Sequence, residues 1–357
     1  MNIRIESLGF PERYQEAAQY KGLYLGRVIA QYKDLYKVAT DNSELIAEIS
    51  GKLRYSNDEL SDYPAVGDFV MLDRENDLHG NGIIHHVLPR KSAFIRRAAG
   101  TSQDVQVVAA NIDTVFICMS LNNDFNLRRL ERYLSISWDS GAIPVVVLTK
   151  SDLCDNLHAR IFEIENNAVG VDVVVTSSIT EDGYKALLKY IAPGRTVAFM
   201  GSSGVGKSTL INRLLGEDLI ETREIRKDDK GRHVTTRREL FVISTGGAVI
   251  DTPGMRELGL ESANLAKTFT DVDELAQWCR FKNCQHESEP GCAVKKAIEE
   301  GTLTEERLIS YKKLKKEAKY EGLNSKQIEK EKINEMFSDF GGMKNARNYI
   351  KSKNKNR

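Results

Sequence analysis

The chain has 357 residues, 41% of them hydrophobic and 29% charged, a composition typical of a soluble globular protein with two or three domains. Lys plus Arg equals Asp plus Glu at 51 each, which excludes a generally basic nucleic-acid-binding protein and leaves only local patches for such contacts. The N-terminus lacks the apolar core of a signal peptide, and the apolar-rich stretch 107–121 is interrupted and too short to span a bilayer. We therefore expect a cytoplasmic protein without a membrane segment.

The first part of the chain reads as short strands separated by glycines. Residues 24–30, 35–39 and 68–72 carry the β-branched and aromatic side chains of half-buried strands. This pattern predicts a small β-barrel over residues 1–95.

From residue 96 the pattern changes to strands that alternate with helices. Six apolar runs, at 114–119, 144–148, 171–175, 196–200, 240–243 and 248–250, are separated by helix-length segments such as 127–138, 153–165 and 207–215. Such alternation predicts an α/β domain with a six-stranded, mostly parallel sheet over residues 96–262. Residues 263–320 hold a Cys/His cluster and helical sequence, and residues 321–357 are predicted to be a helical, basic tail.

A phosphate-binding loop follows the fourth run and precedes a helix, as its mechanism requires. Its eight residues match the G-x-x-x-x-G-K-S/T pattern: Gly201, Ser202, Ser203, Gly204, Val205, Gly206, Lys207 and Ser208. Lys207 is expected to bind the β- and γ-phosphates and Ser208 to ligate Mg²⁺. The alternative is a chance glycine-rich turn.

Two further stretches fit a guanine-nucleotide site. The first stretch is residues 251–254: Asp251 ends a strand and can hold Mg²⁺, and the Gly254 N–H can contact a γ-phosphate. Taken alone, this stretch could be an ordinary turn. Thr149, Lys150, Ser151 and Asp152 follow another strand, where an Asp can accept two hydrogen bonds from guanine; Ser177 and Ser178 can cover the base. In isolation this second stretch could equally be a helix N-cap.

The base loop precedes the phosphate loop by about fifty residues, the reverse of the usual order in guanine-nucleotide switches. Either the base loop is a coincidence or the chain is circularly permuted, and the six-strand count favours permutation.

With these motifs the sequence resembles the ribosome small-subunit-dependent GTPases, bacterial circularly permuted GTPases of 30S maturation. Supporting stretches are 128–134, 201–209, 231–233, 251–257 and 279–292. The resemblance implies an N-terminal OB-fold, a permuted GTPase domain and a C-terminal zinc domain. It also implies GTP hydrolysis stimulated by the small subunit, with Thr209 in the nucleotide site.

Three positions depart from better-known GTPases. Thr149 stands where many carry Asn, which leaves open whether this position supports the phosphate loop. Met255 lies near the place of a water-orienting glutamine, so His233 is the candidate for orienting water, with an exposed loop histidine as the alternative. Val234 replaces a common threonine, so the Mg²⁺-ligating switch threonine is Thr235 or Thr236, and we favour Thr235.

The metal cluster offers three thiolates and one imidazole: Cys279, Cys284, His286 and Cys292. Four such ligands predict one structural zinc ion in a closed coordination sphere. Unligated core cysteines are the alternative, and Cys118 and Cys154 are assigned to it.

The nucleotide motifs predict GTP and GDP with Mg²⁺ as ligands, and the resemblance implies the 30S subunit and its 16S rRNA as partners. We expect the protein to be a monomer. Local basic residues that could contact RNA are Arg90, Lys91, Arg96, Arg97 and the tail from Lys344 to Arg357. Two alternatives remain: an ATP-dependent P-loop enzyme, and an RNA-binding scaffold that uses nucleotide only for folding.

Overall fold

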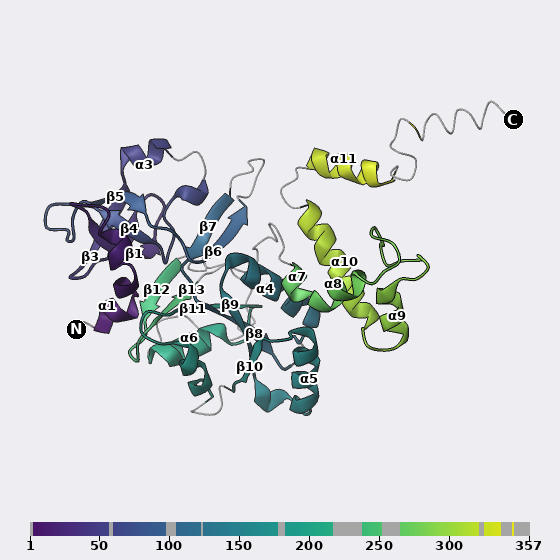
Figure 1. The fold of residues 1–357 in the computed structure, drawn as a ribbon. Helices are drawn as coiled ribbons and strands as arrows, with labels where there is room; N and C mark the ends of the chain where they lie inside the picture. Colours follow the sequence, from purple (N-terminus) through teal and green to yellow (C-terminus); the bar gives the residue numbers. More distant parts are fainter. Residues whose placement is uncertain are drawn as a thin grey trace, which may run out of the picture.

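The structure is a computed structural model, and it describes residues 3–56, 60–97, 105–122, 124–177, 183–216, 238–251, 265–320, 325–336 and 345. Three parts follow one another along the molecule (Figure 1): a barrel at the N-terminal end, a central α/β part, and helices toward the C-terminal end.

The N-terminal part begins with short helices and continues as a five-stranded barrel. Its elements are α1 (Ile3–Ser7), η1 (Phe10–Glu12), α2 (Tyr14–Ala17), β1 (Tyr24–Gln31), β2 (Tyr36–Ala39), β3 (Glu44–Ile49), α3 (Gly51–Ser56), η2 (Leu60–Asp62), β4 (Phe69–Leu72) and β5 (Gly82–Val87). The strand order β1-β2-β3-β5-β4 closes because β4 also pairs with β1, as in an OB-type barrel. Gly26 permits this closure, since an added Cβ would lie 2.5 Å from Val38 and 2.7 Å from Leu72. The sequence predicted three of these strands; β3 and β5 were not predicted.

The central part contains the six predicted strands in one sheet. A hairpin-like pair, β6 (Ala93–Arg97) and β7 (Val105–Ala110), precedes them. The other elements are β8 (Thr114–Ser120), α4 (Leu127–Ser140), β9 (Ile143–Thr149), η3 (Ser151–Leu153), α5 (Leu157–Asn167), β10 (Asp172–Val175), η4 (Lys185–Tyr190), β11 (Thr196–Gly201), α6 (Lys207–Leu215), β12 (Arg238–Val242) and β13 (Ala248–Asp251). The order β10-β9-β8-β11-β13-β12 is parallel except for β12, which runs antiparallel to β13. The prediction of a mostly parallel six-stranded sheet is therefore confirmed.

The barrel and the central sheet are joined by main-chain pairing and by one buried arginine. Strand β1 pairs with β12 through Ala30↔Glu239 and Gln31↔Arg238, so that one sheet runs through both parts. Arg27 on β1 is 1% exposed and donates hydrogen bonds to the Leu8 carbonyl at 2.7 Å and to the Thr196 hydroxyl at 2.8 Å. Because Thr196 begins β11, this side chain fixes the barrel against the strand that leads into the phosphate loop.

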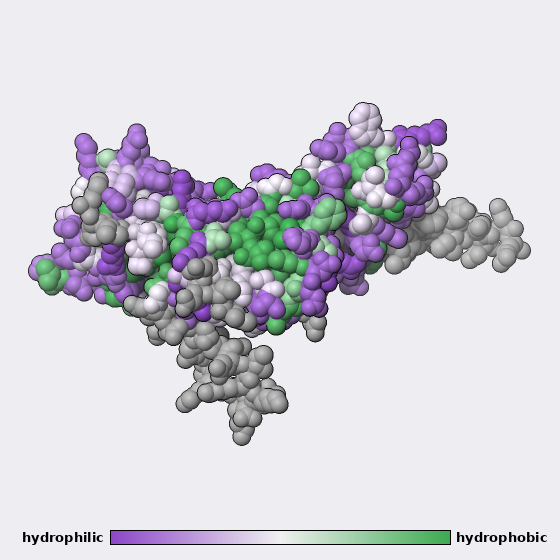
Figure 2. All heavy atoms as spheres, turned by 90° about the horizontal axis from the view of Figure 1, so that it is seen from below, coloured by the Kyte–Doolittle hydropathy of each residue, from purple (hydrophilic) through white to green (hydrophobic). Residues whose placement is uncertain are grey.

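The C-terminal part is helical in its described residues. It contains α7 (Leu265–Thr268), α8 (Thr270–Ala276), α9 (Ala293–Glu299), α10 (Glu305–Tyr320) and α11 (Ser325–Met336). Its contact with the central part is centred on Arg307, which is 7% exposed and bonds to Glu131 of α4 at 2.9 Å and to Asp271 of α8 at 2.6 Å. Seen from below, hydrophobic residues gather over the middle of the molecule and hydrophilic residues dominate both ends (Figure 2).

Candidate nucleotide site and candidate metal centre

The predicted phosphate loop joins β11 to α6, so its position between a strand and a helix N-terminus is as the pattern requires. Gly201 has φ 151°, and a Cβ there would lie 2.4 Å from the Cys118 carbonyl oxygen of β8. Gly204 and Gly206 have φ 75° and 100°, a backbone region that residues other than glycine rarely adopt. The loop therefore needs glycine at position 201, where a Cβ would clash, and favours it at positions 204 and 206.

Lys207 and Asp251 lie beside this loop, close enough for their charges to interact. The Lys207 ammonium donates to the carbonyls of Gly201 at 2.8 Å and Ser202 at 2.6 Å, so it arches back over the loop. Asp251 ends β13, the strand next to β11. Burial raises the pKa of Asp251, and the positive charge of Lys207 opposes that rise. A carboxylate and an ammonium at the carboxyl edge of a parallel sheet form a site for a metal-bound polyphosphate.

The predicted base loop is attached directly to the phosphate loop. The Thr149 hydroxyl, at the end of β9, donates a buried hydrogen bond of 2.6 Å to the carbonyl of Val205. Thr149 thus supports the phosphate loop despite standing where many GTPases have asparagine. This contact resolves the question that the sequence left open.

Asp152 and Ser177 lie together at the same edge of the sheet. The Ser177 hydroxyl donates to the Asp152 carboxylate at 2.6 Å, and both side chains are accessible to solvent. Strands β9 and β10, which precede these residues, are parallel neighbours, so their carboxyl ends present the two loops side by side. Lys150 has φ 56°, which turns the chain sharply after β9. Of the remaining predicted residues, Ser151 begins η3, while Ser203, Ser208 and Thr209 lie in the phosphate loop or the first turn of α6.

Several predicted site residues lie outside the part of the chain that the structure describes. They are Ser178, His233, Thr235, Thr236 and Gly254. The basic tail from Lys344 to Arg357 also lies outside the described part, except for Asn345.

The four predicted zinc ligands converge in the C-terminal part. The Cys279 sulfur lies 3.7 Å from His286 Nδ1 and 3.9 Å from the Cys292 sulfur, and His286 Nδ1 lies 3.4 Å from the Cys292 sulfur. With Cys284, all four ligand atoms lie within 4.8 Å of one another. Zinc–sulfur bonds of about 2.3 Å place the ligands of a tetrahedral ion roughly 3.8 Å apart, so the cluster has the size of a zinc site.

The loop that carries these ligands is shaped by local hydrogen bonds. The Glu289 carboxylate accepts from the main-chain N–H groups of Gln285 at 2.7 Å, Glu287 at 2.8 Å and Ser288 at 3.1 Å. These main-chain bonds lower the pKa of Glu289 to about 2, which keeps the carboxylate ionised and the turn closed. Cys118, by contrast, is buried beneath the phosphate loop, and burial raises the pKa of its thiol to about 12.

The expectation for Arg90 needs correction. Arg90 was predicted to face RNA, but its guanidinium binds the buried Asp68 carboxylate at 2.7 and 2.8 Å and two main-chain carbonyls. Lys91 forms an ion pair with Glu12. The Arg90 guanidinium is therefore engaged within the protein, whereas the Lys91 side chain stays 51% exposed and its expected contact with RNA remains a prediction. The run of charges in the sequence could not reveal their distant partners.

One contact at the phosphate loop was not predicted. Arg129, in the first turn of α4, donates to the Ser202 hydroxyl and to both carboxylate oxygens of Asp124. The sequence singled out the stretch 128–134 only as part of a resemblance, because the contact joins residues 73 positions apart.

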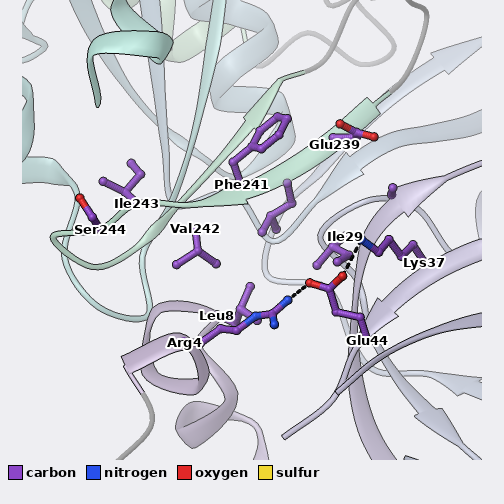
Figure 3. A pocket seen from close by; sticks show the side chains of 12 residues that line it. Arg4, Leu8, Ile29, Lys37, Glu44, Glu239, Phe241, Val242, Ile243 and Ser244 are labelled. Atoms are coloured by element: carbon purple, nitrogen blue, oxygen red, sulfur yellow. Dashed lines mark ion pairs between the residues drawn. The ribbon is translucent and has the colours of Figure 1, made fainter. Parts of the chain in front are cut away.

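A cavity of ≈ 650 Å³ lies away from the nucleotide loops, where α1 and the barrel meet β12. Leu8, Ile29 and Val242 give it an apolar wall, and Glu44 forms ion pairs with Arg4 and Lys37 at its rim (Figure 3). Among the described residues, none of the helices is long and apolar enough to cross a membrane.

Comparison with known families places these loops in context. The family model described as RsgA GTPase matches residues 87–261, which include both nucleotide loops. A model described as ABC transporter matches residues 185–339. Both matches contain the phosphate loop, and only the first contains the base loop.

Similarity to curated proteins decides between the two family models. The chain is 49% identical over 349 residues to a protein of Lactiplantibacillus plantarum named small ribosomal subunit biogenesis GTPase RsgA 2, covering 97% of this chain and 98% of that one. It is 44% identical to RsgA 1 of Listeria innocua, covering 88% and 90%.

Two solved structures share the architecture. The crystal structure of YjeQ from Thermotoga maritima matches with a TM-score of 0.59 and 28% identity, covering 83% of this chain and 98% of that one. The structure of YloQ, described as a circularly permuted GTPase, matches with a TM-score of 0.60 and 25% identity, covering 84% and 96%. With 49% identity over almost its full length to a curated RsgA GTPase, and with the RsgA GTPase model matching residues 87–261, the protein belongs to the RsgA GTPase family and hydrolyses GTP.

Proposed function

We propose that this GTPase acts in the maturation of the small ribosomal subunit and is stimulated by it. The support is the function for which the relatives are named, because these relatives match most of the chain. The main structural support for nucleotide binding is the hydrogen bond from the Thr149 hydroxyl to the Val205 carbonyl, which joins the base loop to the phosphate loop. Sedimentation with purified 30S subunits tests the ribosomal part: we expect more protein to bind with a non-hydrolysable GTP analogue than with GDP. Equal binding with both nucleotides would contradict a nucleotide-dependent partner.

Within the site, each group has a distinct proposed role. The main chain of the phosphate loop and Lys207 bind the β- and γ-phosphates, and Asp152 accepts hydrogen bonds from guanine, with Ser177 beside it. Ser208, Asp251 and Thr235 would hold Mg²⁺, which neutralises phosphate charge when bound. The half-buried Asp251 supports this proposal, because partial burial without a cation is costly for a carboxylate.

His233 is proposed to orient the attacking water, on the strength of its place in a glycine-flanked loop of the sequence. His233→Ala should lower the stimulated rate of hydrolysis and leave the affinity for GTP nearly unchanged. An unchanged stimulated rate would remove His233 from the mechanism.

The Cys/His cluster is proposed to bind one structural zinc ion, because its donor set and dimensions fit a closed four-coordinate site. Such an ion would hold the turns between the ligands in place. We also propose the domain limits 1–95, 96–262, 263–320 and 321–357, a monomeric state and a cytoplasmic location, where ribosomal subunits are assembled.

We propose that 16S rRNA is contacted through aromatic side chains of the zinc-cluster loop. Trp278 is 81% exposed and Phe281 is 41% exposed, and the Arg280 guanidinium lies 5.6 Å from the centre of the Phe281 ring. Exposed aromatic rings beside cations stack on unpaired bases. The adjoining ligands Cys279 and Cys284 would keep these rings in position.

Binding to a single-stranded RNA oligonucleotide tests this contact. Trp278→Ala should weaken binding about five- to 100-fold, the usual contribution of one stacked base. Phe162→Ala is the matched control, because Phe162 is a 65% exposed aromatic residue on α5, outside the cluster. Equal affinities of Trp278→Ala and the unaltered protein would contradict RNA stacking here.

A further inference from the structure

Arg129 connects α4 to the phosphate loop. Its Nη1 donates to Oδ1 and Oδ2 of Asp124 at 2.8 Å each and also to the Ser202 hydroxyl. The side chains of Arg129 and Asp124 are 34% and 36% exposed. The pair therefore lies at the mouth of the nucleotide site and can be reached from solvent.

The turn that presents Arg129 is ordered by its own hydrogen bonds. Asn126 caps α4, because its side-chain oxygen accepts from the Arg129 N–H at 3.0 Å. Asn122 accepts from the Asp124 N–H at 3.1 Å and from the Ser120 hydroxyl at 2.8 Å. Ser120 ends β8, which pairs with β11 through Cys118↔Gly201, so the turn begins beside the phosphate loop.

The helix behind this turn is anchored elsewhere. Glu131, 2% exposed, binds the Arg307 guanidinium at 2.9 Å and the Ser310 hydroxyl, both on α10. Ser135 shares a buried hydrogen bond of 3.0 Å with Thr268 of α7. Contacts with two helices of the C-terminal part thus fix α4 independently of bound nucleotide.

Ser202 is consequently held at two atoms by two cations. Its hydroxyl accepts from Arg129, and its carbonyl accepts from Lys207 at 2.6 Å. We propose that Arg129 is a positioning residue: acting through Ser202, it holds the phosphate loop in the conformation that receives the phosphates of GTP and GDP. Preorganised main-chain donors bind an anion more tightly than donors that must first be ordered.

This role predicts a specific kinetic signature. Arg129→Ala should raise the dissociation constants of GDP and GTP by a similar factor, about three- to ten-fold, the effect of losing one partly exposed charge-assisted hydrogen bond. The value of kcat at saturating GTP should stay near that of the unaltered protein, because the lost contact supports binding in ground state and transition state alike. The dissociation constants of Arg129→Lys should lie between those of the unaltered protein and those of Arg129→Ala, since lysine keeps the charge but lacks the planar fork.

The experiment measures GDP and GTP affinity by fluorescence titration, and kcat and KM by phosphate release. It compares the single variants Arg129→Ala and Ser202→Ala with the double variant. Arg128→Ala is the matched control: Arg128 is the exposed neighbour on the same helical turn. Thermal melts of each variant identify any loss of folding.

We expect the two single variants to lose similar affinity and the double variant to lose no more than either, because both remove the same contact. Wild-type affinity in Arg129→Ala would overturn the inference. Losses that multiply in the double variant would show that Arg129 does not act through Ser202. If the unaltered protein and Arg128→Ala also failed to bind guanine nucleotides, the GTPase assignment itself would fall.

Discussion

The hydroxyl of Thr149 and the carbonyl of Val205, 56 residues apart, are joined by a buried hydrogen bond of 2.6 Å. Thr149 ends the strand that carries the base loop, and Val205 lies inside the phosphate loop. This bond joins the loop proposed to recognise the base to the loop proposed to bind the phosphates, although the two loops occur along the chain in the reverse of the usual order.

Removing this bond should weaken nucleotide binding. Thr149→Val keeps the shape of the side chain but leaves the Val205 carbonyl without its donor, which costs on the order of 1–3 kcal/mol for a buried group. We expect GDP affinity to fall about ten-fold in fluorescence titration, and Thr149→Ser to retain most of it because the hydroxyl is kept. Equal affinities of the valine and serine variants would show that the bond does not matter.

Asp152 should determine the choice of base. Xanthine carries a carbonyl where guanine carries its amino group, so Asp152→Asn should lose affinity for GTP by about 100-fold and gain affinity for XTP. The control is Asp155→Asn, because Asp155 is a nearby exposed carboxylate that lies outside the base loop. Competition of GTP and XTP for the same labelled nucleotide measures both. An Asp152→Asn protein that still prefers GTP would remove Asp152 from base recognition.

The metal cluster should bind one zinc ion per chain, as measured by elemental analysis of the purified protein. Cys284→Ser should reduce the zinc content and lower the melting temperature of the C-terminal part, because the ion is expected to contribute to folding. Cys154→Ser is the matched control, since Cys154 is a free, half-buried cysteine outside the cluster. Full zinc occupancy in the Cys284→Ser variant would contradict this set of ligands.

The buried pair Glu131–Arg307 should be important for attaching the C-terminal helices. Glu131→Gln removes a negative charge that neutralises the buried Arg307 guanidinium, so we expect a loss of roughly 2–4 kcal/mol in the free energy of unfolding. Glu163→Gln provides the comparison: Glu163 pairs with Arg160 at the surface, where both side chains are more than 40% exposed. Its removal should cost less than about 1 kcal/mol. Urea unfolding measures both, and similar losses would show that burial of the pair adds nothing.

The sequence predicted the parts of the fold that depend on local pattern. Each of the six strands of the central sheet contains an apolar run, and α6 begins at Lys207 because the glycine-rich loop ends there. The zinc cluster was predictable because its four ligands lie within fourteen residues. Strands β3 and β5 were missed: Glu44–Ile49 includes two glutamates, and Gly82–Val87 includes two histidines.

Contacts between distant residues could not be predicted. Nothing near Arg27 indicates that a charged side chain would be buried among carbonyl and hydroxyl groups between the barrel and β11. The same holds for Arg90, whose partner Asp68 lies 22 positions away, and for Arg129 with Ser202. In each case the fold brings together groups that the sequence keeps apart.

The most direct test of the account is phosphate release from GTP, with ATP as the control, measured with and without purified 30S subunits. The account predicts slow release from GTP alone, a large increase when 30S subunits are added, and none from ATP under either condition. A rate of phosphate release from GTP that does not change when 30S subunits are added would contradict the proposed partner. Phosphate release from ATP would contradict the role of Asp152 in base recognition.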